Sequence, residues 1–261
     1  MLKRILSGAI GVPLLIFIVM SGGMVLKLST LVVVLIALKE FYHSFNQIEI
    51  YPLSYLGYIF TIFMYFTVSS FYVNFTFLLI TFAVLLIFLF NKKVALTDIS
   101  ITLLGFLYIS YFLLHIILTS TLDSNMLIWF IFIIAWSADT SAYFAGNFFG
   151  TKIFGPKKLF PEVSPKKTIE GFVGGILGST LASFIFSYLF LPDFLVHSTI
   201  LGFLGSFISQ TGDLVASKIK RTVGIKDFGN VMPGHGGILD RFDSILLIAP
   251  IVYYYTLFFF K

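Results

Sequence analysis

Long apolar runs recur along the whole chain, and they restrict its fold more than any other feature. We find about nine such segments, each long enough to form a helix in lipid: roughly 5–22, 24–41, 52–69, 71–90, 99–119, 125–147, 169–191, 194–216 and 243–260. Since 58% of the 261 residues are hydrophobic and only 11% are charged, a soluble core cannot absorb this much apolar surface. The runs lack the alternation of barrel strands, which favours helices. The sequence therefore predicts an all-α, polytopic membrane helix bundle with about nine transmembrane helices.

The lysines and arginines indicate how this bundle is oriented. With the N-terminus in the cytoplasm, about 15 of the 17 basic residues fall on the inner side, which predicts a cytoplasmic N-terminus and an exterior C-terminus. Lys3 and Arg4 precede an apolar run as in a signal peptide, but Pro13 and the lack of an A-x-A site favour an uncleaved first helix.

The polar segments indicate where the chemistry takes place. We divide the chain into N-terminal membrane helices over residues 1–130 and a C-terminal half over 131–261, which carries two long polar loops, 148–168 and 217–242. Both loops face the cytoplasm on this topology, so we expect an active site at the inner face of the membrane; we take this membrane to be a bacterial inner membrane. The chain has no cysteine, which excludes disulfides and thiolate metal sites.

Ionisable side chains gather between Ser217 and Asp243, in a chain that is otherwise overwhelmingly apolar. They are Lys218, Lys220, Arg221, Lys226, Asp227, His235, Asp240, Arg241 and Asp243. Basic groups beside carboxylates, with glycines between them, suit a phosphorylated substrate and a divalent cation.

Four aspartates lie near the predicted inner ends of membrane segments: Asp139, Asp213, Asp240 and Asp243. A carboxylate within a membrane costs on the order of 2.5–3.5 kcal/mol on insertion scales, so it tends to face a bundle interior. Mg²⁺ binds one or two carboxylates and completes its shell with water and phosphate oxygens, so we predict a Mg²⁺ site, with a second cation possible. The alternative for each aspartate is an ion pair or a helix N-cap, above all for Asp243.

Three further motifs stand out. In Ser164–Thr168, two lysines and a hydroxyl at a helix start are suited to anionic oxygens, although membrane orientation alone also explains the lysines, as it does for Lys157 and Lys158. The glycine-rich turn at 234–237 holds His235, a candidate to contact phosphate, ligate metal or transfer a proton. The small-residue spacing of the seventh segment predicts close helix packing, within the chain or between subunits.

With these motifs in view, the chain resembles the phosphatidate cytidylyltransferase, or CDP-diacylglycerol synthase, family. The family's SPKKT-x-EG segment matches Ser164 to Gly171, and its W-x-x-D-x-x-A-Y-x-x-G segment matches Trp136 to Gly146. Its C-terminal signature falls on Ser217, Lys220, Arg221, Lys226, Asp227, Gly229, Pro233, His235, Gly236, Gly237, Asp240, Arg241 and Asp243. The departure is Met232, where another apolar residue is usual.

The resemblance implies Mg²⁺-dependent transfer of the cytidylyl group of CTP to phosphatidate, giving CDP-diacylglycerol and pyrophosphate for phospholipid biosynthesis, by a homodimer. It implies a role in catalysis for Asp213, Lys226, Asp227, His235 and Asp240. It implies substrate binding by Ser164, Lys166, Lys167, Thr168, Ser217, Lys220, Arg221 and Arg241. It implies metal binding by Asp139, Asp213, Asp240 and Asp243.

Two alternatives stay open at this point. A CTP-dependent lipid kinase of the dolichol or phytol type uses similar substrates in a membrane bundle. An ion-coupled transporter also carries intramembrane aspartates, but nearer the bilayer midplane. No P-loop or Rossmann motif is present in the sequence, so nucleotide binding of those types is not expected.

Overall fold

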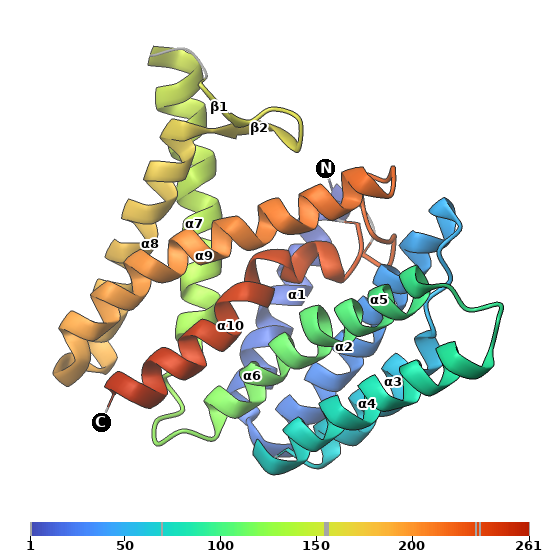
Figure 1. Cartoon of the computed structure of the whole chain (residues 1–261). Coiled ribbons are helices and arrows are strands. Elements are labelled where there is room, and N and C mark those ends of the chain that lie inside the picture. Colours follow the sequence, from blue (N-terminus) through green and yellow to red (C-terminus); the bar gives the residue numbers. More distant parts are fainter. Residues whose placement is uncertain (1, 69, 154–156, 233, 235, 261) are drawn as a thin grey trace. The chain divides into compact units, whose positions relative to one another are not determined.

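The computed structural model of the chain describes residues 2–68, 70–153, 157–232, 234 and 236–260, and it divides into two compact units. The first unit is Met1–Leu118 with Val223–Arg241, and the second is Thr119–Thr222 with Phe242–Lys261 (Figure 1). The first contains α1 (Leu2–Ser21), α2 (Gly23–Phe45), η1 (Asn46–Ile48), α3 (Ser54–Phe66), α4 (Ser70–Phe90), α5 (Leu96–Gly105), η2 (Phe106–Tyr111) and most of α6 (Phe112–Ser120). The second contains α7 (Trp129–Ala145), η3 (Gly146–Ile153), β1 (Lys158–Phe160), β2 (Ser164–Thr168), α8 (Ile169–Phe190), η4 (Pro192–Phe194), α9 (Leu195–Thr222) and, beyond its first turn, α10 (Leu239–Phe259).

Each predicted apolar segment coincides with a helix of the structure. In the described part of the chain, five helices are long and apolar enough to cross a membrane: Tyr72–Phe90, Leu96–Ser120, Ile169–Phe190, Pro192–Thr222 and Leu239–Phe259. Two shorter apolar helices are Ala9–Ser21 and Ser54–Phe66. These findings confirm a membrane protein of the all-α class, whereas the number of about nine spans stays a prediction.

The first unit is held together by aromatic and polar contacts between its helices. Tyr42 of α2 is 2% exposed, and its hydroxyl donates to the backbone oxygen of Thr102 in α5 at 2.8 Å. The ring lies against Gly57 of α3 and Gly105 of α5, where an added Cβ would overlap it. The three helices therefore approach closely because two of them have a glycine at the Tyr42 contact.

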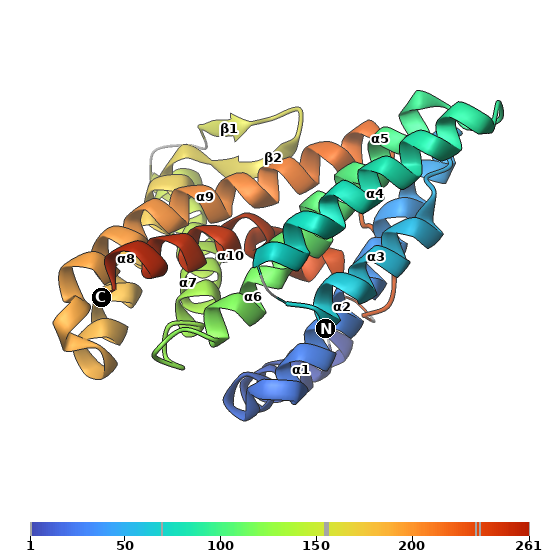
Figure 2. The same ribbon diagram turned by 60° about the horizontal axis from the view of Figure 1, so that its bottom comes forward.

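In the second unit, α7, α8 and α9 lie side by side, as the two views in Figures 1 and 2 agree. The predicted small residues of α8 make this packing possible within the chain. A Cβ added at Gly171 would lie 2.8 Å from the backbone oxygen of Ala142 in α7, and one at Gly178 would overlap the side chain of Ser141. Gly212 of α9 similarly lies against α10, since its Cβ would be 2.8 Å from the backbone oxygen of Asp243.

The polar segment before α8 is not a simple loop. Among the described residues, the only strands are β1 and β2, which pair antiparallel with Lys158 opposite Thr168 and Phe160 opposite Ser164. Figure 2 shows β2 beside α9, and Arg221 Nε of α9 donates to the backbone oxygen of Val163 at 3.5 Å. For the described residues of 148–168, the prediction of a loop is therefore wrong, because they form a wide helical turn to Ile153 and a hairpin from Lys158.

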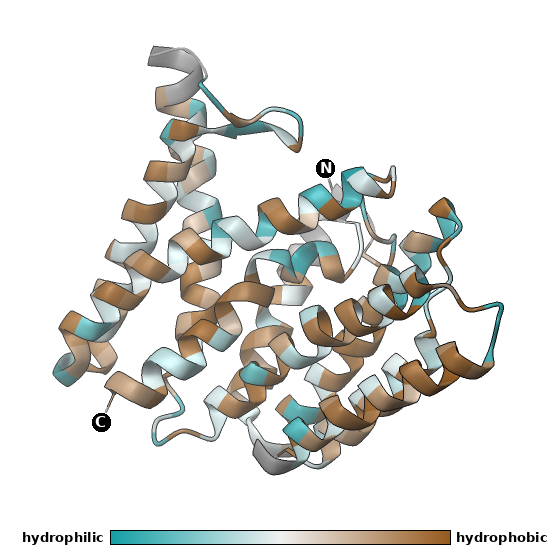
Figure 3. Ribbon diagram, viewed as in Figure 1, coloured by the Kyte–Doolittle hydropathy of each residue, from teal (hydrophilic) through white to brown (hydrophobic). Residues whose placement is uncertain are grey.

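The second predicted loop begins later than expected. The helix α9 continues to Thr222, so Lys218, Lys220 and Arg221 extend from a helix rather than a loop. Basic side chains in a last helical turn are favoured by the negative end of the helix dipole, and Gly224 with a φ of 77° then turns the chain away. Figure 3 shows hydrophilic residues at the hairpin and near helix ends, while the helix shafts are mostly hydrophobic.

Candidate active site

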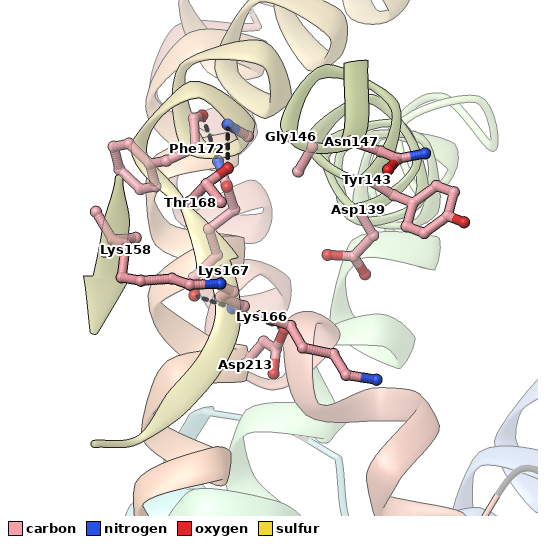
Figure 4. Close-up of a pocket in the computed structure, with 14 residues that line it drawn as sticks. Asp139, Tyr143, Gly146, Asn147, Lys158, Lys166, Lys167, Thr168, Phe172 and Asp213 are labelled. Carbon is pink, nitrogen blue, oxygen red and sulfur yellow. Dashed lines mark hydrogen bonds and ion pairs between the residues drawn. The ribbon is translucent and has the colours of Figure 1, made fainter. Parts of the chain in front are cut away.

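A cavity of about 370 Å³ opens in the second unit between α7, α8, α9 and the hairpin (Figure 4). Its walls combine carboxylates and lysines with aromatic and small residues. The lining residues are Asp139, Ala142, Tyr143, Gly146, Asn147, Lys158, Leu159, Lys166, Lys167, Thr168, Gly171, Phe172, Gln210 and Asp213. The cavity thus brings together five predicted site residues, Asp139, Lys166, Lys167, Thr168 and Asp213.

Asp213 of α9 and Lys167 of β2 form an ion pair at the wall of this cavity. The Lys167 Nζ lies 2.7 Å from Asp213 Oδ2 and 3.4 Å from the backbone oxygen of Gln210. The two side chains are 25% and 26% exposed, so neither is sealed from solvent. The Ser217 hydroxyl, one helical turn further along α9, donates to Asp213 Oδ1 at 3.2 Å. Ser217 therefore contacts a carboxylate of this site, and its predicted contact with substrate stays a prediction.

Two further carboxylates belong to the same unit. The Ser244 hydroxyl donates to Asp139 Oδ2 at 3.0 Å, which links α7 to α10. Asp243 Oδ2 lies 4.0 Å from the Nζ of Lys220, and these side chains are only 14% and 10% exposed. The negative charges of Asp213 and Asp139 act on Asp243, and the positive charge of Lys220 partly offsets them. Such a group of acids gains stability when a cation is bound nearby.

The donors present fit a hard cation such as Mg²⁺. Asp139 and Asp213 supply carboxylate oxygens from two helices, and Figure 4 shows both side chains at the cavity. Two carboxylates suffice for Mg²⁺, because water and substrate phosphates complete its shell. Within the described residues, no three or more acidic or histidine side chains are already arranged around one metal position. A metal would therefore depend on substrate oxygens for much of its coordination.

Several predicted substrate-binding residues have partners within the protein. Thr168 is 5% exposed, and its hydroxyl accepts from the backbone N–H of Gly171 at 3.1 Å, so it is the N-cap of α8. Arg221 contacts the hairpin and Lys220 lies near Asp243. Ser164 begins β2.

The predicted site residues of the signature segment are not among the residues that line this cavity. Lys226, Asp227, Asp240 and Arg241 lie in the first unit, and His235 lies outside the described residues. Asp240 is 7% exposed, and its Oδ2 accepts from the backbone N–H groups of Phe228 and Gly237 at 2.8 and 2.9 Å. It thus has a structural role in the signature segment, and its pairing with Asp213 as a metal ligand stays a prediction.

Sequence reasoning missed several residues of the cavity. Lys158 had been explained by membrane orientation alone, but the hairpin pairs it with Thr168 and places it in the cavity wall. Gln210 also lines the cavity, and its amide donates to the backbone oxygen of Phe172 at 3.2 Å, joining α9 to α8. A polar amide within an apolar segment was the available signal for Gln210. No sequence signal indicated the pairing of Lys158.

The fold and the cavity define an integral membrane protein in which helices position carboxylates, and a hairpin positions lysines, at one polar site. A family model described as "Cytidylyltransferase family" matches residues 2–259, and the chain belongs to this family. This confirms the family predicted from the motifs.

Curated relatives agree with this assignment. A phosphatidate cytidylyltransferase of Bacillus subtilis is 37% identical over 180 residues, which cover 66% of this chain and 65% of that protein. Proteins of the same name from Staphylococcus saprophyticus and Staphylococcus haemolyticus are 31% and 32% identical, and each alignment covers 95% of this chain and 96% of the relative.

Proposed function

We propose that this protein transfers the cytidylyl group of CTP to phosphatidate, giving CDP-diacylglycerol and pyrophosphate. The family and the names of the relatives bear out this prediction from the sequence and do not favour a lipid kinase or a transporter. The observation that carries the proposal is the cavity of the second unit, where carboxylates from α7 and α9 face lysines of the hairpin. Such a site suits a reaction in which every reacting group carries phosphate.

The reaction needs charge neutralisation more than proton transfer. An ionised oxygen of the phosphatidate phosphate attacks the α-phosphorus of CTP, and the bond to the bridging oxygen breaks. Pyrophosphate leaves with that electron pair, so the atoms balance without a covalent enzyme intermediate. Because the attacking phosphate is already ionised, no general base is required. Lys158, Lys166 and Lys167 supply positive charge for phosphates that repel one another before they react.

We further propose that the reaction depends on Mg²⁺ held by Asp139 and Asp213, together with Asp240 and Asp243. Mg²⁺ would supply charge stabilisation at the α-phosphate of the cytidylyl group and at the leaving pyrophosphate. The ion pair of Asp213 with Lys167 supports an exchange on binding. When substrate binds, Lys167 would leave Asp213 and contact a substrate phosphate, and the Asp213 carboxylate would then be available to bind a cation. Lys226, Asp227, Arg241 and His235 remain proposed substrate or catalytic contacts of the signature segment.

The membrane arrangement is also part of the proposal. About nine spans, a cytoplasmic N-terminus and an inner-membrane location would place the polar site at the cytoplasmic face, where soluble CTP meets a membrane lipid. The excess of lysine and arginine on one predicted side supports this orientation. A homodimer is proposed on family resemblance.

One assay tests the reaction. Purified protein in detergent is incubated with phosphatidate, Mg²⁺ and CTP labelled at the α-phosphate. We expect a labelled lipid and one pyrophosphate for each lipid formed. A kinase would release CDP from CTP instead, and an unlabelled lipid fraction would contradict cytidylyl transfer. Omission of Mg²⁺ with added chelator should abolish the labelled product.

A further inference from the structure

A buried glutamate in the first unit contacts the signature segment and has no role assigned above. Glu40 lies on α2 and is 7% exposed. Its Oε1 accepts from the backbone N–H of Ile238 at 3.0 Å, and its Oε2 accepts from that of Leu239 at 2.8 Å. These N–H groups belong to the start of α10, almost 200 residues further along the chain. Glu40 therefore caps a helix from a different part of the sequence.

Two glycines of the signature make room for this carboxylate. A Cβ added at Gly229 would overlap Oε1 of Glu40, and one at Gly237 would overlap Oε2. Neither glycine has a positive φ, so steric space rather than backbone conformation explains the lack of a side chain at these positions. At Gly237, the close approach expected of a glycine-rich turn is made by a protein carboxylate.

Little else of regular structure holds this segment among the described residues. Between α9 and α10, one isolated bridge joins Met232 to Gly236, and Gly224, Gly234 and Gly236 have positive φ. Asp240 also contacts this segment, since it accepts the backbone bonds from Phe228 and Gly237 described above. Two buried carboxylates, one from α10 itself and one from α2, thus bind backbone N–H groups of the signature segment.

The charge of Glu40 matters as well as its shape. A helix N-terminus carries a partial positive charge, and bonds from N–H groups to a carboxylate are stronger than bonds between neutral groups. A glutamine of the same size offers one acceptor oxygen, and its NH₂ would face a backbone N–H. The site therefore requires a carboxylate.

We propose that Glu40 is a positioning residue for cytidylyl transfer. Its carboxylate holds the described residues around Gly229 and Gly237, and the first turn of α10, in the conformation that the reaction requires. This inference rests on the proposed function, since it matters to catalysis only if the signature segment takes part in it.

The test compares Glu40→Gln with a matched control, Asp98→Asn. Asp98 is also a buried carboxylate of the first unit, 6% exposed, and also accepts two backbone N–H bonds, from Tyr51 and Ala95, each at 2.8 Å. Each variant keeps the side-chain size and removes the charge. Only the Glu40 variant alters bonds to the signature segment.

The first measurement is hydrogen exchange of the folded protein, which needs no substrate. We expect faster exchange of peptides within 226–241 in Glu40→Gln and unchanged exchange there in Asp98→Asn. Equal exchange in the wild type and Glu40→Gln would overturn the proposal even if the enzymatic activity were something else.

The second measurement is turnover per folded molecule in the pyrophosphate assay. We expect kcat of Glu40→Gln to fall at least about tenfold and that of Asp98→Asn to change less than about twofold. A fall of kcat equal to that of the control would leave Glu40 with a structural role alone and refute the proposal. A wild-type protein that releases no pyrophosphate would instead refute the proposed function.

A second variant, Gly237→Ala, tests the same contact in case Glu40→Gln expresses poorly. Gly237→Ala keeps Glu40 but places a methyl group where its carboxylate lies, so it should accelerate exchange in the same segment and lower kcat in the same way. In the double variant, the two losses should be less than additive, because both act through one contact. Additive losses would contradict the proposal.

Discussion

Replacement of Asp213 by asparagine tests the proposed metal site most directly. In the folded protein, the Asp213 carboxylate has an ion pair with Lys167 at 2.7 Å and a hydrogen bond from Ser217 at 3.2 Å. The paired side chains are about a quarter exposed, so we expect the pair to contribute only about 0–1 kcal/mol to stability. The asparagine oxygen still accepts a hydrogen bond. Asp213→Asn should therefore fold and purify like the wild type.

The effect on turnover should be much larger than the effect on stability. If the carboxylate holds a cation that stabilises the transition state by about 3–4 kcal/mol, its loss lowers the rate roughly a hundred- to a thousandfold. The assay is pyrophosphate release at saturating CTP, phosphatidate and Mg²⁺, expressed per folded molecule. Thermal unfolding of the same preparation separates loss of chemistry from loss of fold.

Two exposed acids of the same unit are controls for this prediction. Asp123 and Asp193 lie at the surface, outside the cavity wall, and their replacement by asparagine should be nearly silent. Retention of more than about a tenth of the wild-type rate in Asp213→Asn would refute its assignment as a metal ligand. A comparable loss in the Asp123 or Asp193 variants would show that the assay reports general damage.

Three further predictions follow from the structure. Replacing Lys166 and Lys167 together by glutamine should lower turnover or raise the KM for CTP, whereas Lys157→Gln, outside the cavity wall, should match the wild type in the same assay. Gly178→Leu should lower the yield and melting temperature of folded protein, because its side chain would overlap Ser141 where α8 meets α7; by overpacking alone the cost is about 1–3 kcal/mol or more. A reporter fused to the C-terminus should be exterior to the inner membrane, and a cytoplasmic reporter would contradict an odd number of spans.

The cavity wall shows where sequence patterns reach their limit. The Ser164–Thr168 motif was identified in the sequence from its lysines and its hydroxyl. In the structure, the hydroxyl of Thr168 caps the N-terminus of α8, and Lys158 also lines the cavity. The cap is a local bond, but the place of Lys158 depends on the register of a short hairpin, in which Lys158 lies opposite Thr168. Strand pairing is set by contacts between segments, and three- and five-residue strands have too little periodicity to be found in a sequence.

Glu40 is a second example of this limit. A lone acid near the end of an apolar segment was visible in the sequence and, by its cost in a membrane, was a signal of a specific partner. The partner itself was not visible, because the N–H groups that it binds belong to Ile238 and Leu239 and carry no side-chain signal. The lack of a side chain at Gly229 and Gly237 is likewise explained only by the contact with Glu40, which the structure places beside them.

The sequence by itself determined the helical membrane architecture and the kind of chemistry. Apolar runs specify helices wherever the backbone must satisfy its own hydrogen bonds in lipid, and clusters of lysine and aspartate indicate phosphate and cations whatever their exact placement. The tertiary structure alone decided which of these residues meet. The ion pair of Lys167 with Asp213, the capping of α10 by Glu40 and the close packing of α8 on α7 each join segments that are distant in the chain. Such contacts follow from packing and register, which local composition does not encode.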